Sequence, residues 1–225
     1  MIFTFWEGPM PGYIKLCLDT WKAPFTILNY DNLGDYTDLP IEQIKRFTLP
    51  HIADCVRVHV LRDQGGYWLD ADTIMLTGAL PDTDLVGDPE QRTNTIGLLY
   101  SEPRSDMFTE WARYQDKIIN GPETPNHWAV MGNAFTDAYV KEHGEIRIRS
   151  VWNYWPETYM VKDNIPRYQK YVRFYFEMQH SLDDIRPTDL LMLHNSWTPK
   201  WYKDLKLSEV LMQNCTMSNV LREAL

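Results

Sequence analysis

Apolar residues along the chain alternate between short, strand-like runs and longer segments with helical spacing. Runs of strand length, bounded by glycine, proline or polar residues, occur at Ile2–Trp6, Phe25–Tyr30, Tyr67–Leu69 and Thr95–Tyr100. Apolar positions three to four residues apart predict helices at Ile14–Trp21, Pro40–Phe47, His51–Gln64, Ser105–Ile119 and Val130–His143. Strands that alternate with helices predict an α/β fold with helices on both faces of the sheet.

The last third of the chain has a less regular pattern. Its apolar runs predict further strands at Ile146–Trp152 and Tyr171–Phe176. Another apolar run, within Asp189–Trp197, ends in the polar residues His194, Asn195 and Ser196, and the tail that follows has helical spacing. In α/β sheets, ligands bind beyond the carboxyl ends of strands. The polar ends of strands are therefore the first places to look for a site.

Composition and charge narrow the class of protein. With 225 residues, of which 44% are hydrophobic and 24% charged, the chain has the composition of a folded, soluble protein. Its net charge of -9 argues against a nucleic-acid-binding function. No apolar run reaches the roughly 18 to 20 residues of a membrane span, and the first residues do not resemble a signal peptide. Three widely spaced cysteines (Cys17, Cys55 and Cys215) predict reduced thiols and a cytoplasmic location.

The segment Gly65–Asp72, with the sequence GGYWLDAD, carries two carboxylates directly after a short strand. Residues two apart in an extended chain point to the same side, so Asp70 and Asp72 can converge on one ligand. Carboxylate oxygens suit hard cations such as Mg²⁺ and Mn²⁺. A solvated turn explains the same pattern, and a second Asp-x-Asp at Asp82 and Asp84 shows how easily it arises.

A second polar pair lies on the helix before that strand. Asp54 and Arg57 are three residues apart, so they are neighbours on one helix face and present a carboxylate beside a forked donor. An ordinary ion pair within the helix is the structural alternative.

The two pairs belong to one longer pattern, A-D-x-x-R followed by L-x-x-x-G-G-x-[YW]-x-D-x-D, within residues 52–76. This pattern resembles the DXD-containing, sugar-binding glycosyltransferase family. That family includes capsular polysaccharide synthesis proteins, fungal initiating mannosyltransferases and clostridial glucosylating toxins. The resemblance implies a GT-A-like, Rossmann-type α/β sandwich with a mixed, mostly parallel sheet. It also implies one domain over residues 1–225, with a donor-binding half (about 1–100), an acceptor-side half (about 101–197) and a helical tail (198–225).

The resemblance assigns the acidic residues to the donor and its metal. Asp54 and Arg57 match the pair that holds the donor sugar. Asp70 matches the first acid of the DXD motif, which contacts the sugar or ribose, and Asp72 matches the acid that coordinates Mn²⁺ or Mg²⁺. The resemblance thus makes Asp54, Arg57, Asp70 and Asp72 the candidate catalytic residues.

Both ends of the chain contribute to the same implied site. Phe5 or Trp6, at the end of the first strand, matches the aromatic residue against the nucleotide base. Ser196 and Trp197 match a C-terminal motif that closes over the diphosphate and metal. His194 is a candidate metal ligand because a neutral imidazole can join carboxylates on Mn²⁺, and a purely structural histidine is the alternative.

The chain departs from the family pattern in residues 126–135, where many relatives carry a Gly-Pro loop near the acceptor. His127 and Asn133 are the candidate acceptor-side residues of this segment. Capping of the helix that follows is the structural alternative for Asn133.

The expected activity is retaining transfer of a sugar from a nucleotide-sugar, with a UDP-sugar favoured, to a glycan or lipid-linked acceptor. The metal would stabilise the diphosphate leaving group. Lys200, Lys203 and Lys206 lie beside Trp201 and Tyr202. This arrangement suits peripheral contact with the inner face of an anionic membrane, or simply a solvated basic helix face.

Two other functions fit parts of the sequence. In a haloacid-dehalogenase-like phosphotransferase, Asp70 would be the nucleophile and Asp72 the acid and base, with Asp183 and Asp184 as a later acidic pair. That reading leaves Asp54, Arg57 and the two glycines unexplained. A module that binds a nucleotide-sugar without transferring it would have the same donor site, so only turnover separates it from an enzyme.

Overall fold

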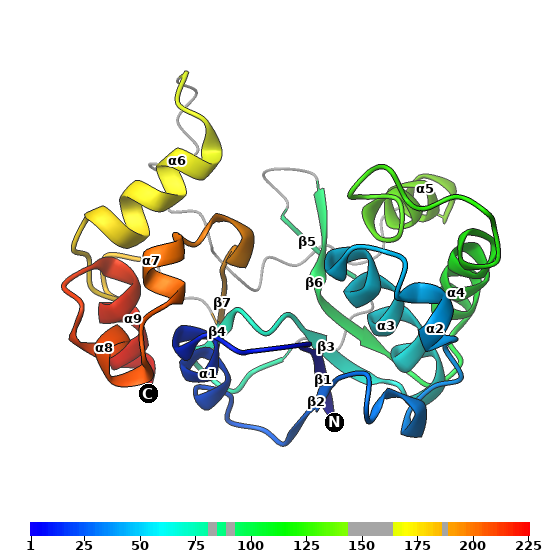
Figure 1. Ribbon diagram of the computed structural model, residues 1–225, viewed down its shortest axis with the longest axis horizontal. Helices are drawn as coiled ribbons and strands as arrows, with labels where there is room; N and C mark the ends of the chain where they lie inside the picture. The colour runs from blue at the N-terminus through cyan, green and yellow to red at the C-terminus, as the bar shows by residue number, and fades with distance from the viewer. Residues whose placement is uncertain (81–84, 89–92, 144–163, 186–188) are drawn as a thin grey trace. The chain divides into compact units, whose positions relative to one another are not determined.

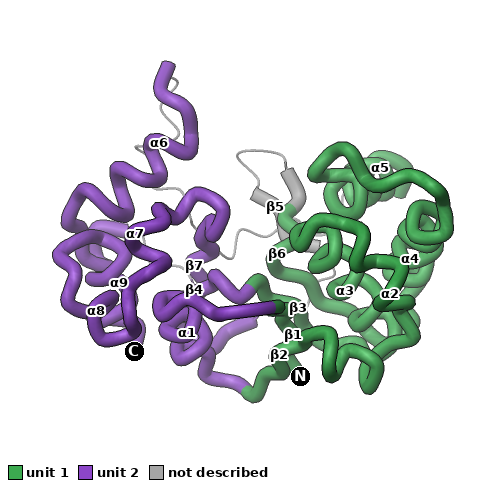
Figure 2. The backbone as a smooth tube through the Cα atoms, viewed as in Figure 1, with its two compact units in different colours: residues 1–7, 24–70, 81–150 green, residues 8–23, 71–80, 151–225 purple. Residues whose placement is uncertain are grey.

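In the computed structural model, which describes residues 1–80, 85–88, 93–143, 164–185 and 189–225, the chain divides into two units (Figures 1 and 2). Unit 1 consists of residues 1–7, 24–70 and 81–150, and unit 2 of residues 8–23, 71–80 and 151–225. The chain therefore crosses from one unit to the other several times. The predicted division into donor half, acceptor half and tail stays a prediction.

Unit 1 is built on a mixed five-stranded sheet in the order β2-β1-β3-β6-β5. Its strands are β1 (Ile2–Phe5), β2 (Phe25–Leu28), β3 (Gly66–Leu69), β5 (Leu85–Asp88) and β6 (Thr93–Ser101). β1 pairs in parallel with both β2 and β3, whereas β6 is antiparallel to β3 and to β5. The predicted α/β fold with a mixed sheet is confirmed.

The helical segments of unit 1 are η1 (Leu33–Asp35), α2 (Ile41–Ile44), α3 (Leu49–Gln64), α4 (Asp106–Ile119) and α5 (Asn133–His143). α3 packs against β1, β3 and β6, and α4 packs against α3. Together with the sheet they form one hydrophobic core that includes Phe3, Val56, Trp68 and Trp111. Because α3 is covered from several sides, even its polar residues Asp54 and Arg57 are buried.

Two glycines turn the chain from α3 into β3. Gly65 (φ 65°) and Gly66 (φ 89°) both adopt backbone angles that side chains disfavour. A Cβ atom on Gly66 would lie 2.6 Å from the backbone oxygen of Met1, and one on Gly65 would lie equally close to the ring of Pro103. The diglycine of the motif is therefore required by the fold, because neither position has room for a side chain and both need a positive φ.

Unit 2 contains a two-stranded antiparallel sheet of β4 (Thr73–Met75) and β7 (Leu190–Met192), with Ile74 opposite Leu191. Its helical segments are α1 (Gly12–Asp19), α6 (Arg167–Val172), η3 (Arg173–Glu177), η4 (Asn195–Trp197), α7 (Lys200–Lys203), α8 (Leu207–Met212) and α9 (Thr216–Ala224). The helical tail that the spacing predicts is confirmed.

The predicted strand at Tyr171–Phe176 is wrong. These residues form the end of α6 and the π-helical turn η3. Their aromatic character favours strands, but Tyr171, Phe174 and Tyr175 follow helical spacing and are all buried. Burial of one helical face therefore outweighs β propensity here. The other strand predicted for this region, Ile146–Trp152, lies outside the described residues.

None of the helices that the structure describes has both the length and the apolar character needed to cross a membrane. The three cysteines are buried and free, as expected for reduced thiols. The predicted cytoplasmic location stays a prediction.

Candidate functional site

In unit 1, the structure brings Asp54 and Arg57, near the middle of α3, together with Asp70, which follows the carboxyl end of β3. Nη2 of Arg57 lies 3.1 Å from Oδ1 of Asp54 and 3.2 Å from Oδ1 of Asp70. Asp54 and Arg57 are almost fully buried, with 7% and 5% exposure, whereas Asp70 is partly exposed. One guanidinium therefore links two carboxylates, and the exposed member of the cluster is Asp70.

The guanidinium of Arg57 is held in place by further contacts. Its Nε donates to the backbone oxygen of Ala53 at 3.4 Å, and its Nη1 donates to that of Ile96. The ring of Trp68 lies 5.2 Å from the guanidinium, and the Trp68 indole N–H donates to Oδ1 of Asp70 at 2.8 Å. Such contacts fix a planar donor in one orientation. Arg57 and Trp68 thus orient the Asp70 carboxylate.

Burial controls the charge of Asp54. It raises the pKa of this carboxyl group to about 7, an effect that Arg57 opposes and the nearby Asp70 strengthens. The protonated form of Asp54 is therefore favoured more than in an exposed aspartate, and a protonated carboxyl group can donate as well as accept a hydrogen bond.

Two residues without any signal in the sequence support Asp54. Gln115 of α4 donates through Nε2 to the backbone oxygen of Asp54 at 3.0 Å and to that of Met131 at 2.6 Å. The residue after Met131, Gly132, lies so close that a Cβ atom would be 3.3 Å from Oδ2 of Asp54 and would collide with Ile96. Only a small residue fits there, so the loop before α5 packs directly against the carboxylate.

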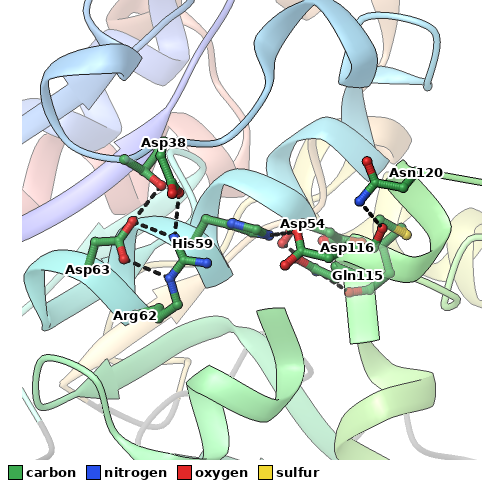
Figure 3. A network of polar contacts seen from close by, with 10 residues as sticks. Asp38, Asp54, His59, Arg62, Asp63, Gln115, Asp116 and Asn120 are labelled. Atoms are coloured by element: carbon green, nitrogen blue, oxygen red, sulfur yellow. Dashed lines mark hydrogen bonds and ion pairs between the residues drawn. The ribbon is translucent and has the colours of Figure 1, made fainter. Parts of the chain in front are cut away.

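The polar contacts around α3 that Figure 3 draws include His59 as well as Asp54 and Gln115. Arg62 pairs with Asp38 and with Asp63, at 2.7 Å each. His59 is only 1% exposed, and its Nε2 lies 3.6 Å from Oδ1 of Asp116. That distance is too long for a hydrogen bond. Burial, assisted by the positive charge of Arg62, lowers the pKa of His59 to about 4. His59 is therefore neutral and belongs to the core.

The lowered pKa of His59 predicts acid sensitivity. Because the unfolded chain binds this proton first, the contribution of His59 to folding stability falls as the pH drops from about 6.5 to about 4, whereas the raised pKa of Asp54 acts in the opposite direction. The His59 contribution to the free energy of unfolding, read as the difference between wild type and a variant without this histidine, should decrease by about 2–3 kcal/mol over this range. Urea unfolding of wild type and His59→Leu at several pH values measures the decrease. The difference between the two proteins should change over this range, and parallel curves would contradict the prediction.

In unit 2, the structure brings Asp72 to the segment of residues 193–195. The pairing of Thr73 with Met192 extends one step further, because the Leu193 N–H donates to the backbone oxygen of Asp72 at 3.1 Å. The Asn195 N–H donates to Oδ2 of Asp72 at 2.7 Å. The β4–β7 register therefore sets Asp72 beside the polar end of β7, next to His194.

Buried tyrosines surround this segment, and the sequence did not reveal them. The His194 N–H donates to the hydroxyl of Tyr171 at 3.1 Å, and the Tyr13 hydroxyl donates to Oδ1 of Asn195. Burial raises the pKa of Tyr13, Tyr171 and Cys17 well above their usual values, and the negative charge of Asp72 adds to each increase. These groups therefore stay neutral, and Asp72 contributes a negative potential to its surroundings.

Asp72 and His194 offer two candidate protein ligands for a divalent cation. Across the part of the chain that the structure describes, no three or more His, Cys, Asp or Glu residues are grouped to hold a metal ion. Mg²⁺ and, by similar chemistry, Mn²⁺ bind through one or two protein groups when phosphates and water supply the remaining ligands. The negative potential of Asp72 also favours a cation. Its effect is visible at Lys203: burial lowers the pKa of this lysine, and the charge of Asp72 opposes that decrease.

At the end of β1, the two candidate base-binding aromatics differ in accessibility. Phe5 is 8% exposed and packs edge-on against Tyr30 at 5.9 Å, so it belongs to the core. Trp6 is half-buried, and its backbone N–H donates to the backbone oxygen of Leu28 at 2.9 Å. Of the two, Trp6 is better placed to offer a ring face to a ligand; that role stays a prediction.

The remaining candidates also stay predictions. His127 is exposed, and its Nδ1 accepts the Ala129 N–H at 3.3 Å. Asn133 is the first residue of α5 and is half-buried. Ser196 is exposed, and the ring of Trp197 lies 4.0 Å from that of His194.

Most of the basic tail is exposed, including Lys200 and Lys206, whereas Tyr202 is buried. The hydroxyl of the buried Tyr202 bonds to Ser218 at 2.8 Å, and Lys200 pairs with Asp204 at 2.6 Å. Trp201 is 48% exposed. The predicted membrane contact therefore depends mainly on Trp201 and the lysines around it.

The sequence matches the family described as capsular polysaccharide synthesis protein over residues 1–184. The chain belongs to this family, as its motif predicts. The match includes Asp54, Arg57, Asp70 and Asp72 and ends before His194.

Among solved structures, the chain is similar to one named "PaToxG Glycosyltransferase". The sequence identity is 15% and the TM-score 0.42, and the match covers 63% of this chain and 68% of that chain. No curated protein matches the sequence.

Proposed function

We propose that the protein is a metal-dependent, retaining glycosyltransferase that moves a sugar from a nucleotide-sugar, preferably a UDP-sugar, to a glycan or lipid-linked acceptor. One observation carries the proposal. Arg57 joins the buried Asp54 to the partly exposed Asp70, two residues before Asp72, in a member of the capsular polysaccharide synthesis family. A solvated turn would not need a buried arginine to orient its first acid.

The sugar end of the donor is assigned to Asp54, Arg57 and Asp70. Carboxylates that are held rigidly can accept hydrogen bonds from sugar hydroxyls and fix the direction of the anomeric carbon. Of the three residues, the partly exposed Asp70 is the most accessible to a sugar. Arg57 contributes by holding both carboxylates in place, and in this proposal Trp6 stacks on the base.

The diphosphate end is assigned to Asp72 and His194. These two would hold Mn²⁺ or Mg²⁺, which supplies Lewis-acid stabilisation of the leaving diphosphate. Ser196 and Trp197 would lie over the phosphates. Only Ala71 separates Asp70 from Asp72, so their Cα atoms are at most about 7 Å apart.

The stereochemistry and the partners are carried over from the family resemblance. We expect attack on the same face of the sugar that the diphosphate leaves, through an oxocarbenium-like transition state. Trp201, Lys200 and Lys206 are proposed to contact an anionic membrane surface where a lipid-linked acceptor resides. His127 and Asn133 are proposed for the acceptor side.

The test is nucleoside diphosphate release from a panel of UDP- and GDP-sugars with Mn²⁺, Mg²⁺ or EDTA. Because slow hydrolysis of the donor also releases the nucleoside diphosphate, the assay needs no acceptor. We expect release from one donor that EDTA abolishes, and ¹H NMR of the first product should show the anomer of the donor.

Other outcomes identify the rival functions. Phosphate release from p-nitrophenyl phosphate without any donor cleavage would indicate the phosphotransferase. Metal-dependent binding of a nucleotide-sugar without turnover would indicate a binding module. If neither binding nor turnover occurs with any donor, the glycosyltransferase proposal is wrong.

A further inference from the structure

Three consecutive residues follow β7, and the backbone N–H of each one donates a hydrogen bond. The Leu193 N–H donates to the backbone oxygen of Asp72 and the Asn195 N–H to its carboxylate. Between them, the His194 N–H donates to the hydroxyl of Tyr171 at 3.1 Å. The orientation of His194 therefore depends on a side chain that comes from another element, α6.

Tyr171 is fully buried and contacts the segment in two further ways. Its ring lies edge-on to the ring of His194 (5.8 Å, 79°) and to the ring of Trp197 (5.7 Å, 68°). The hydroxyl of the buried Thr198 donates to the backbone oxygen of His194 at 3.2 Å. Both the amide and the carbonyl of His194 are thus fixed by buried hydroxyls.

Tyr13 acts in the same way on the next residue. It comes from α1, is fully buried, and donates its hydroxyl proton to Oδ1 of Asn195. Its ring also packs at 5.8 Å from that of Tyr202. Tyr13 and Tyr171 therefore hold successive residues, Asn195 and His194, from two different helices.

We propose that Tyr171 and Tyr13 are positioning residues that set the orientation of His194 and Asn195 beside Asp72 and thereby the affinity of this site for a divalent cation. The inference rests on the proposed function in one respect, namely that Asp72 and His194 hold the cation. Groups that orient metal ligands typically change metal affinity by about 10- to 100-fold when they are removed. Neither tyrosine touches the cation itself.

The chemistry of the tyrosines supports this role. A phenylalanine at position 171 would keep the ring contacts with His194 and Trp197 but leave the His194 amide without its acceptor. A buried amide that loses its acceptor is costly, so the segment would move to find another one. The substitution would therefore disturb the geometry of the metal ligands rather than the packing of unit 2.

The experiment compares Tyr171→Phe and Tyr13→Phe with the matched control Tyr202→Phe. Tyr202 is equally buried and loses a hydrogen bond to Ser218, which does not belong to residues 193–198. Electron paramagnetic resonance of free Mn²⁺ gives the dissociation constant without turnover, both with Mn²⁺ alone and with Mn²⁺ and UDP. Thermal unfolding of each variant reports the cost to the fold.

We expect Mn²⁺ binding to weaken by about 10- to 100-fold in Tyr171→Phe and in Tyr13→Phe, and to stay unchanged in Tyr202→Phe at a similar loss of thermal stability. Wild-type affinity in both of the first two variants would overturn this inference alone. Equal weakening in all three variants would also overturn it, because the effect would then follow stability. A wild-type protein that does not bind Mn²⁺ would overturn the proposed metal site together with the inference.

Discussion

Replacing Arg57 with methionine should destabilise the protein by about 3–5 kcal/mol and abolish donor turnover. The substitution leaves the buried Asp54 and its neighbour Asp70 without the guanidinium that lies 3.1 and 3.2 Å from them. The free energy of unfolding, measured with urea, should fall further as the pH rises. Asp54 already has a raised pKa, and its protonated form needs no counter-charge.

Arg62→Met is the matched control. It removes an arginine from the same helix that also pairs with two acids, Asp38 and Asp63, but its side chain is partly exposed. Asp38 is exposed and Asp63 partly exposed, so water can compensate for the loss of the guanidinium; this variant should lose less stability than Arg57→Met and retain turnover. Equal losses in the two variants would mean that Arg57 has no special role in holding the carboxylates.

The sequence was sufficient for the part of the site that depends on local spacing. Asp54 and Arg57 are one helical turn apart, and the glycine pair marks the sharp turn that brings Asp70 to the end of β3. These relations extend over fewer than about ten residues and follow from helix and strand geometry alone. For the same reason, the α/β class could be predicted from the apolar pattern.

The supporting residues could not be predicted because they depend on contacts across the chain. Tyr13 and Asn195 are 182 residues apart, and Gln115 lies 61 residues from Asp54. Tyr171 was assigned to a strand, since its aromatic neighbours favour β structure, and a strand at this position gives no reason to expect its hydroxyl beside His194. Gly132 has no pattern of its own, and only the approach of Asp54 shows why a larger residue would not fit.

The substitution Asp72→Asn removes the negative charge of this residue but keeps the hydrogen bonds that it makes to the segment after β7. An asparagine keeps a side-chain oxygen, which can still accept the Asn195 N–H that now lies 2.7 Å from Oδ2. The backbone bond from Leu193 does not involve the side chain at all. We therefore expect thermal stability close to that of wild type.

Donor turnover, in contrast, should fall by about 10²- to 10³-fold in Asp72→Asn, because the negative charge that attracts the cation is gone and the diphosphate loses its stabilisation. The measurement is nucleoside diphosphate release with saturating Mn²⁺. Asp189→Asn is the control, since it makes the same change at the other end of the β4–β7 pair, where Asp189 accepts a hydrogen bond from Thr77 at 2.6 Å. If Asp72→Asn turns over the donor as fast as this control does, Asp72 is a structural residue that holds the segment after β7, and the metal site lies elsewhere.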